Sequence, residues 1–123
     1  GDPHFAARDR MGRNLAFLCR VAASSWRAAP RGIAVDEATA LLVANGGYAS
    51  VAGEGKVYFL QAPGLPQVCA AIHPLTNRNI GVARIATGDG FDLATWAPVG
   101  GMPYTVTADI GVVSSTQAGA SAY

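Results

Sequence analysis

The sequence predicts an α/β fold, and within that class the second half of an α/β sandwich. The chain has 123 residues, 50% of them hydrophobic, which suffices for one core and is too short for two domains. One amphipathic helix is followed by about seven short strand-like segments, and 15 glycines with 7 prolines suit tight turns. A β-rich sheet with a single covering helix also fits, but that helix would need more to pack on, which favours the sandwich.

The helix is expected over residues 7–23. Its apolar residues recur at steps of three and four, which makes one apolar stripe: Met11, Leu15, Leu18 and Val21. Pro30 cannot continue a helix, so the helix ends before it.

Strand-like segments follow Gly32. They are residues 33–35, 41–43, 48–51, 56–60, 79–86, 104–108 and 110–114. Residues 48–51 and 56–60, joined at Gly53-Glu54-Gly55, predict a hairpin, and the last two segments predict another. Residues 91–96 fit a short helical or an extended piece.

Composition excludes several classes of protein. Nine Lys+Arg against eight Asp+Glu leave a net charge of +1, which argues against a nucleic-acid binder. No apolar run reaches about 18 residues, so neither a membrane-spanning helix nor a membrane partner is expected. Cys19 and Cys69 are too few for a disulfide scaffold; each fits a small buried apolar residue, or the two form one bridge in an exported protein.

The chain begins at Gly1, without an initiator Met or a signal-peptide pattern. We interpret this start as either a processing site or a boundary within a longer protein. Residues 1–123 are therefore expected to form the C-terminal part of a single domain that an upstream or partner chain completes. No metal-ligand spacing or phosphate loop is present, so no metal and no cofactor are predicted.

Two motifs carry candidate chemistry. Residues 2–13, DPHFAARDRMGR, place a histidine, the natural proton shuttle near neutral pH, before arginines suited to binding carboxylates. Residues 32–40, GIAVDEATA, place two acids between apolar strands, where a carboxylate could orient a histidine. The alternatives are a solvated helix face with a packing histidine, and a polar turn.

A nucleophile is missing from the sequence. No serine lies in a G-x-S-x-G strand-turn-helix elbow, neither cysteine lies in a nucleophile motif, and Gly1 has no side chain that could act as an N-terminal nucleophile. The chain thus offers a base, an acid and cations, and the nucleophile is expected elsewhere.

The two motifs, in this order, resemble those of the cyanophycinase family of serine peptidases, which includes the aspartyl dipeptidases. The family pattern is Asp-Gln-His-Phe, two residues, then Arg-x-Arg-x-Gly-Arg, followed later by Gly-Ile-x-x-Asp-Glu-x-Thr-Ala and a Gly-x-Val-Tyr strand. The Gly-x-Val-Tyr strand is matched by GKVY at 55–58. The segments FDLATW at 91–96 and STQAG at 115–119 resemble the exported cyanophycinase-like branch of the family. The resemblance implies the C-terminal half of a three-layer α/β/α sandwich, flavodoxin-like and similar to class I glutamine amidotransferases, mostly β here with one N-terminal helix.

The resemblance also implies the roles of site residues in a Ser-His-Glu triad. His4 matches the catalytic histidine, and Glu37 matches the acid that orients it, with the adjacent Asp36 left open as the alternative. The serine would lie upstream. The substrate-binding positions implied by the resemblance are Asp2, Arg8, Arg10 and Arg13. Pro3 departs from the family's substrate-holding Gln, which broadens the expected substrate from cyanophycin to Asp-containing peptides.

The leading hypothesis is therefore a serine peptidase whose precursor is cleaved into two chains, with self-processing as one route. Its expected partners are the N-terminal chain of the same precursor carrying the serine, an acidic peptide substrate and a second copy of the assembled enzyme. The resemblance places it in the periplasm or outside the cell, with the cytoplasm as the alternative. The competing hypotheses are a non-catalytic relative that acts as a binding or structural module, and a free-standing β-rich binding domain.

Overall fold

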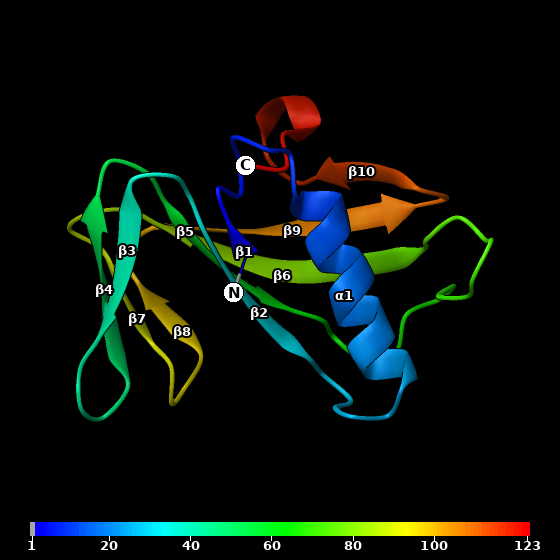
Figure 1. Cartoon of the computed structure of the whole chain (residues 1–123), viewed down its shortest axis with the longest axis horizontal. Helices are drawn as coiled ribbons and strands as arrows, with labels where there is room; N and C mark the ends of the chain where they lie inside the picture. Colours follow the sequence, from blue (N-terminus) through cyan, green and yellow to red (C-terminus); the bar gives the residue numbers. More distant parts are fainter. Residues whose placement is uncertain (1) are drawn as a thin grey trace.

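A computed structural model describes residues 2–123, with the side chain of Asp2 excepted. Its centre is a twisted six-stranded sheet (Figure 1). In spatial order the strands are β1 (Asp2–Pro3), β2 (Arg31–Val35), β5 (Val57–Gln61), β6 (Asn77–Ile85), β9 (Met102–Asp109) and β10 (Val112–Ser115). Among the described residues, β1 pairs with β2 in parallel and every other pair in this sheet is antiparallel.

One α-helix, α1 (Met11–Ala23), covers one face of the sheet (Figure 1). Its apolar stripe is buried, with Met11 and Leu15 at or below 1% exposure. The helix begins later than the expected residue 7, because residues 4–10 form tight turns instead. There the Asp9 N–H donates to the Ala6 carbonyl at 3.0 Å and the Arg10 N–H to the Phe5 carbonyl at 3.1 Å.

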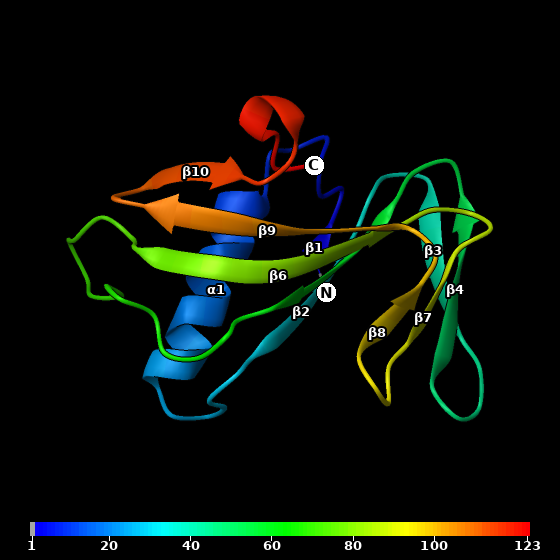
Figure 2. The same cartoon turned by 180° about the vertical axis from the view of Figure 1, so that it is seen from behind.

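A second, four-stranded sheet packs against the opposite face of the first, at one end of the molecule (Figure 2). Its strands, in spatial order, are β3 (Thr39–Val43), β4 (Tyr48–Gly53), β7 (Gly90–Asp92) and β8 (Ala97–Val99). The rings of Phe59 from the first sheet and Phe91 from the second stack at 3.7 Å, with Trp96 edge-on to both.

Strand β5 lies between the two hydrophobic cores. Tyr58 and Leu60 face α1, whereas Val57 and Phe59 face the second sheet, and all four are at or below 1% exposure. A strand buried on both faces has a continuous apolar run rather than an alternating one, as the sequence has here.

The expected three-layer α/β/α sandwich is wrong. The structure is mostly β, with antiparallel sheets and one α-helix in the described residues. A three-layer sandwich needs parallel strands linked by crossover helices on both faces. Here the neighbouring strands are antiparallel, short turns link β3 to β4, β7 to β8 and β9 to β10, and part of the face opposite α1 is covered by the second sheet. The β-rich arrangement with one covering helix, which the sequence analysis ranked second, is closer.

The expected hairpin between residues 48–51 and 56–60 is also wrong. Both strands form, but β4 pairs with β3 and β7, while β5 pairs with β2 and β6. The chain crosses between the sheets at Gly53, whose φ of +119° suits glycine and where a Cβ would collide with the Ala38 carbonyl. The strand near 79–86 and the final hairpin are confirmed as β6 and as β9–β10.

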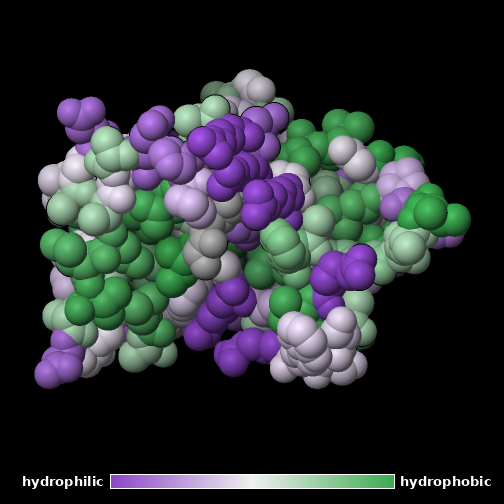
Figure 3. All heavy atoms as spheres, in the orientation of Figure 1, coloured by the Kyte–Doolittle hydropathy of each residue, from purple (hydrophilic) through white to green (hydrophobic). Residues whose placement is uncertain are grey.

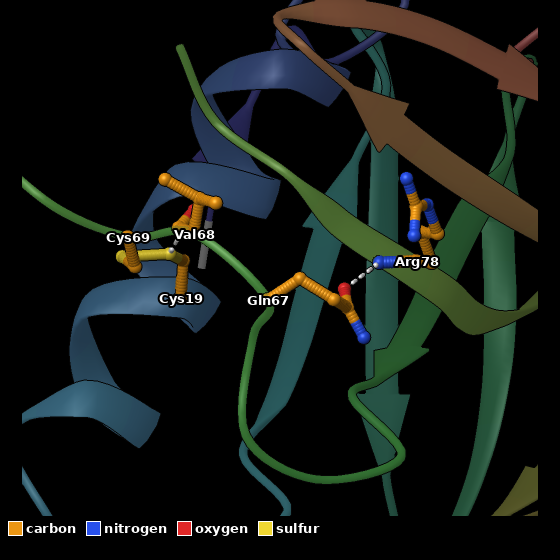
Figure 4. The surroundings of a disulfide bond; sticks show 5 residues. All are labelled: Cys19, Gln67, Val68, Cys69 and Arg78. Atoms are coloured by element: carbon orange, nitrogen blue, oxygen red, sulfur yellow. Dashed lines mark hydrogen bonds between the residues drawn. A yellow bond between two sulfur atoms is a disulfide. The ribbon is translucent and has the colours of Figure 1, made fainter. Parts of the chain in front are cut away.

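A disulfide between Cys19 and Cys69 ties α1 to the loop that follows β5 (Figure 4). The two Cα atoms lie 6.0 Å apart, within the usual range. Beside it, the Arg78 N–H donates to the Gln67 side-chain oxygen at 3.0 Å, which ties the same part of the loop to β6. No helix in residues 2–123 has the length and apolar character needed to cross a membrane.

Candidate functional site

The loop over residues 4–10, which leads from β1 into α1, carries most of the candidate residues and is anchored by Phe5. The Phe5 side chain is fully buried, with its ring 5.0 Å from Tyr58 and 5.5 Å from Tyr123. Its N–H donates to the Val35 carbonyl at 3.2 Å, which extends the parallel alignment of β1 with β2. The preceding residue, His4, has a φ of +53°, an uncommon conformation that this anchoring holds.

His4 and Glu37 meet at the surface beside this anchor. The His4 Nδ1 lies 3.5 Å from the Glu37 Oε1, with 39% and 67% of the two side chains exposed. The distance is longer than a tight hydrogen bond, and catalytic contacts are often loose without substrate. With Nδ1 turned to the carboxylate, Nε2 is the ring nitrogen left to accept or return a proton.

Asp36 does not contact the imidazole but holds the loop that carries it. Its Oδ1 accepts the Ala6 N–H at 3.0 Å, and its Oδ2 accepts the Lys56 N–H at 3.1 Å. The Tyr58 hydroxyl is 3.5 Å from the same Oδ2. Burial, together with this nearby carboxylate, raises the pKa of Tyr58 well above its usual range. The structure thus separates the two adjacent acids: Glu37 faces His4, and Asp36 is bonded to the backbone on both sides.

Thr39 fixes the turn that presents Glu37. The Thr39 hydroxyl donates to the Glu37 carbonyl at 2.8 Å and accepts the Gly55 N–H at 2.9 Å. Gly55 has no room for a side chain, because a Cβ there would lie 2.6 Å from both the Asp36 Cβ and the Thr39 hydroxyl. In the Asp-Glu-x-Thr pattern, Asp36 therefore binds the loop that carries His4, Glu37 contacts His4 itself, and Thr39 holds the turn between them and β3.

Tyr123 is a residue of this site that the sequence analysis did not identify. Its hydroxyl donates to the Asp9 Oδ1 at 2.7 Å and accepts the Met11 N–H at 2.8 Å. Helix α1 has no side-chain cap from its own N-cap residue, so Tyr123 satisfies one of its free N–H groups. The one available signal was an aromatic residue in an otherwise small and polar tail.

The arginines of the first motif do not converge on one point. Arg10 donates from Nη1 to the Pro3 carbonyl at 2.7 Å, which braces the loop from within. Arg8 is exposed, and hydrophilic side chains gather over this segment (Figure 3). Arg13 lies on α1 with its guanidinium 5.6 Å from the Phe17 ring. The side chain of Asp2 lies outside the described residues.

The site as described brings together an imidazole and a carboxylate, the two kinds of group that a proton relay uses. No serine, threonine or cysteine side chain within residues 2–123 hydrogen-bonds to His4. Across the same residues, no group of three or more His, Cys, Asp or Glu side chains is arranged to hold a metal ion. The arrangement can therefore accept and return a proton, and a reaction that needs a nucleophile requires it from another segment or chain.

Comparisons with protein-family models, with curated proteins and with solved structures give no match for this chain.

Proposed function

We propose that this chain supplies the histidine and the acid of a Ser-His-Glu relay in a serine-type hydrolase that cleaves peptide or isopeptide bonds in Asp-containing substrates. The observation that carries the proposal is the 3.5 Å approach of the His4 Nδ1 to the Glu37 Oε1. These residues are 33 positions apart in the sequence and come from the two motifs that resemble the cyanophycinase family.

In the proposed mechanism, His4 Nε2 takes the proton of a serine hydroxyl as that oxygen attacks the scissile carbonyl. The same nitrogen then returns the proton to the leaving amine, and a water molecule hydrolyses the acyl-enzyme by the reverse sequence. Glu37 orients the ring and stabilises the imidazolium. The serine comes from the N-terminal chain of the same precursor, which completes the active site.

The acidic substrate class rests on the arginines near His4. Arg8 is exposed within the loop over residues 4–10 and can pair with a substrate carboxylate, whereas Arg10 is bonded to the Pro3 carbonyl and braces the backbone. A guanidinium matches a carboxylate with two parallel N–H donors. Asp-containing peptides offer that group.

An exported setting accords with the same proposal. Disulfides such as Cys19–Cys69 persist in oxidising compartments and are rare in reducing ones. We therefore place the enzyme in the periplasm or outside the cell.

A second candidate function is a non-catalytic binding module with the same loop. The exposure of both His4 and Glu37 favours it, since general-base pairs are usually shielded from water in the working enzyme. The coding sequence upstream of Gly1 separates the two candidates: a Gly-x-Ser-x-Gly elbow supports the hydrolase, and its replacement supports the binding module.

The direct test uses the chain assembled with its serine-bearing partner and an aspartyl-p-nitroanilide substrate. His4→Ala should lower kcat by about four orders of magnitude or more, and Glu37→Gln by a smaller factor. Glu54→Gln is the matched control, because Glu54 is exposed on a neighbouring turn. Near-normal turnover of His4→Ala would overturn the proposal.

A further inference from the structure

Two loops meet at the end of the molecule opposite the second sheet (Figures 1 and 2). One is residues 69–75, within the long connection from β5 to β6, and the other is the turn between β9 and β10. The Gly111 N–H of the turn donates to the Leu75 carbonyl at 2.9 Å, and the Ile110 N–H donates to the Thr76 hydroxyl oxygen at 3.2 Å. The two loops therefore form one continuous surface.

Apolar side chains project into solvent from both loops. Ile72 is fully exposed, Ile110 is 71% exposed, and Pro74 is exposed as well. We call the surface made by Ile72, Pro74 and Ile110 the isoleucine tip. Figure 3 shows apolar surface at this end of the molecule. Exposed apolar surface made by neighbouring side chains commonly marks a site of contact with a protein or a membrane.

Both isoleucines have a backbone conformation that β-branched residues rarely adopt. The φ angles are +62° for Ile72 and +49° for Ile110. In the turn, Ile110 precedes Gly111, whose φ is +79°, and two-residue turns with two positive φ values usually have Asn, Asp or Gly at the first position. Isoleucine in this conformation destabilises the fold. Because exposed side chains do not offset that cost by packing, the strain indicates a contact outside the chain.

The backbone beneath the isoleucine tip is held by bonds within the chain. Val68 and Thr76 exchange backbone hydrogen bonds of 2.9 and 3.0 Å at the base of the first loop, and the disulfide ties the adjacent Cys69 to α1. In the turn, the N–H groups of Ile110 and Gly111 are both bonded to the first loop and its base. A segment whose polar backbone groups are already bonded enters an apolar medium at lower cost than one with free groups.

The charged groups beside the isoleucine tip are cationic on balance. Arg20 and His73 line a hollow of about 160 Å³ next to the first loop, and no acidic residue lines it. Neither side chain has a carboxylate within salt-bridge distance among the described residues. Asp109, which precedes Ile110, is paired with Arg78 at 2.8 Å and so is neutralised. Apolar side chains beside unpaired cations are the combination that binds the surface of an anionic bilayer.

We propose that the isoleucine tip inserts into the surface of an anionic lipid bilayer, with Ile72 and Ile110 at the hydrocarbon boundary and Arg20 at the lipid phosphates. A stable protein interface takes about 20 to 30 residues from each side, whereas a few projecting side chains suffice to anchor a loop in a fluid bilayer. The sequence predicted no membrane partner because no apolar run can span a bilayer, but insertion of loop tips needs no such run. This goes beyond the proposed hydrolase function, because it requires neither His4 nor a nucleophile.

The test is co-sedimentation of the whole chain with vesicles made of equal parts of phosphatidylcholine and phosphatidylglycerol. Binding should be at least about fivefold stronger than to pure phosphatidylcholine vesicles and should weaken with added salt. Arg20→Gln should lower it by about fivefold. Lys56→Gln is the matched control, because Lys56 is exposed and lies at the end of β5 away from the first loop, and it should bind as the unaltered chain does. No binding to the mixed vesicles, or equal binding to the two compositions, would overturn the proposal.

Two variants separate contact with lipid from a structural role of the isoleucines. Ile72→Asn and Ile110→Asn should each weaken vesicle binding at least about tenfold, since an apolar side chain is lost from the bilayer. Each should also raise the midpoint of urea denaturation by about 0.5 M, because Asn adopts positive φ more readily than Ile. Loss of binding by a more stable chain cannot come from unfolding.

Leu42→Asn is the control for these variants, because Leu42 is 54% exposed on β3, in the second sheet, and its loss should leave vesicle binding unchanged. Equal binding by Ile110→Asn and Leu42→Asn would refute the proposal, as would a lower urea midpoint for Ile110→Asn. A dimer in sedimentation velocity that Ile110→Asn abolishes would assign the tip to a second copy of the chain and refute it too.

Discussion

Replacing Tyr123 with Phe should destabilise the whole fold through the loop that carries His4. The change keeps the ring, which packs 5.5 Å from Phe5 and 6.1 Å from Tyr58. It removes only the hydroxyl and with it the hydrogen bonds to the Asp9 carboxylate and from the Met11 N–H. Residues 9–11 would lose their attachment to the C-terminal tail.

The size of the effect follows from what each lost bond leaves behind. A hydrogen bond to a charged group contributes about 1.5 to 3 kcal/mol, and one between neutral groups about 1 kcal/mol. Asp9 is exposed, so water takes the place of the Tyr123 hydroxyl and offsets much of the loss of that hydrogen bond. The Met11 N–H starts a helix with no side-chain cap, and loss of a cap costs about 1 kcal/mol. The free energy of unfolding should fall by about 2 kcal/mol in total.

Urea denaturation followed by circular dichroism measures this change. With a slope of about 2 kcal/mol per molar urea, the midpoint should fall by about 1 M. Tyr48→Phe is the matched control, because Tyr48 is 48% exposed and its hydroxyl makes no hydrogen bond to the described residues; it should change stability by less than about 0.5 kcal/mol. If the two variants were equally stable, the attachment of the loop by Tyr123 would be refuted.

Two further predictions concern the disulfide and the buried tyrosines. The Cys19–Cys69 bridge spans 50 residues, so the double variant Cys19→Ala/Cys69→Ala should lose up to about 4 kcal/mol of unfolding free energy in urea; an unchanged midpoint would contradict this. Burial raises the pKa of Tyr104 to about 12, and burial also raises those of Tyr58 and Tyr123 above their usual range. Because these folded-state pKa values exceed the unfolded value, the stabilisation is complete below about pH 10 and is lost as pH rises toward 12. Tyrosinate absorbance at 295 nm should therefore rise together with the loss of far-ultraviolet circular dichroism, and ionisation of all tyrosines in a still folded chain would contradict the reasoning.

Local patterns in the sequence predicted most of the elements, but of the two predicted pairings only the final hairpin, β9–β10, was correct. The steps between Met11, Leu15 and Leu18 gave the helix correctly because the period is a property of one segment. The predicted pairing of β4 with β5 was wrong. A glycine-containing turn between two apolar runs looks the same in the sequence whether the two strands form a hairpin or the chain moves to another sheet at that turn. The steric contact of Gly53 with Ala38 that sets the crossing is nonlocal, and no short pattern contains it.

The candidate site, like the fold, was predictable only in part. The sequence marked His4, Glu37 and Asp36 as chemically notable, and the structure brings the first two within 3.5 Å; their catalytic role remains a prediction. Adjacent residues on an extended backbone point in different directions, so spacing alone did not decide which acid faces the imidazole. Tyr123 was missed because its contact with Asp9 joins residues 114 positions apart.

The way His4 is held bears on what any catalytic role would still require. Its backbone is fixed on three sides: the Phe5 anchor, the Asp36 bond to Ala6, and the Tyr123 bonds at the start of α1. This fixes the direction in which the side chain leaves the backbone, whereas the ring is not held by burial, since 39% of the side chain is still exposed. A preorganised base in water gains little from its carboxylate, because an exposed ion pair contributes at most about 1 kcal/mol. The Glu37 contact would strengthen once a second segment excluded water from the pair, and such a segment would also have to bring the nucleophile.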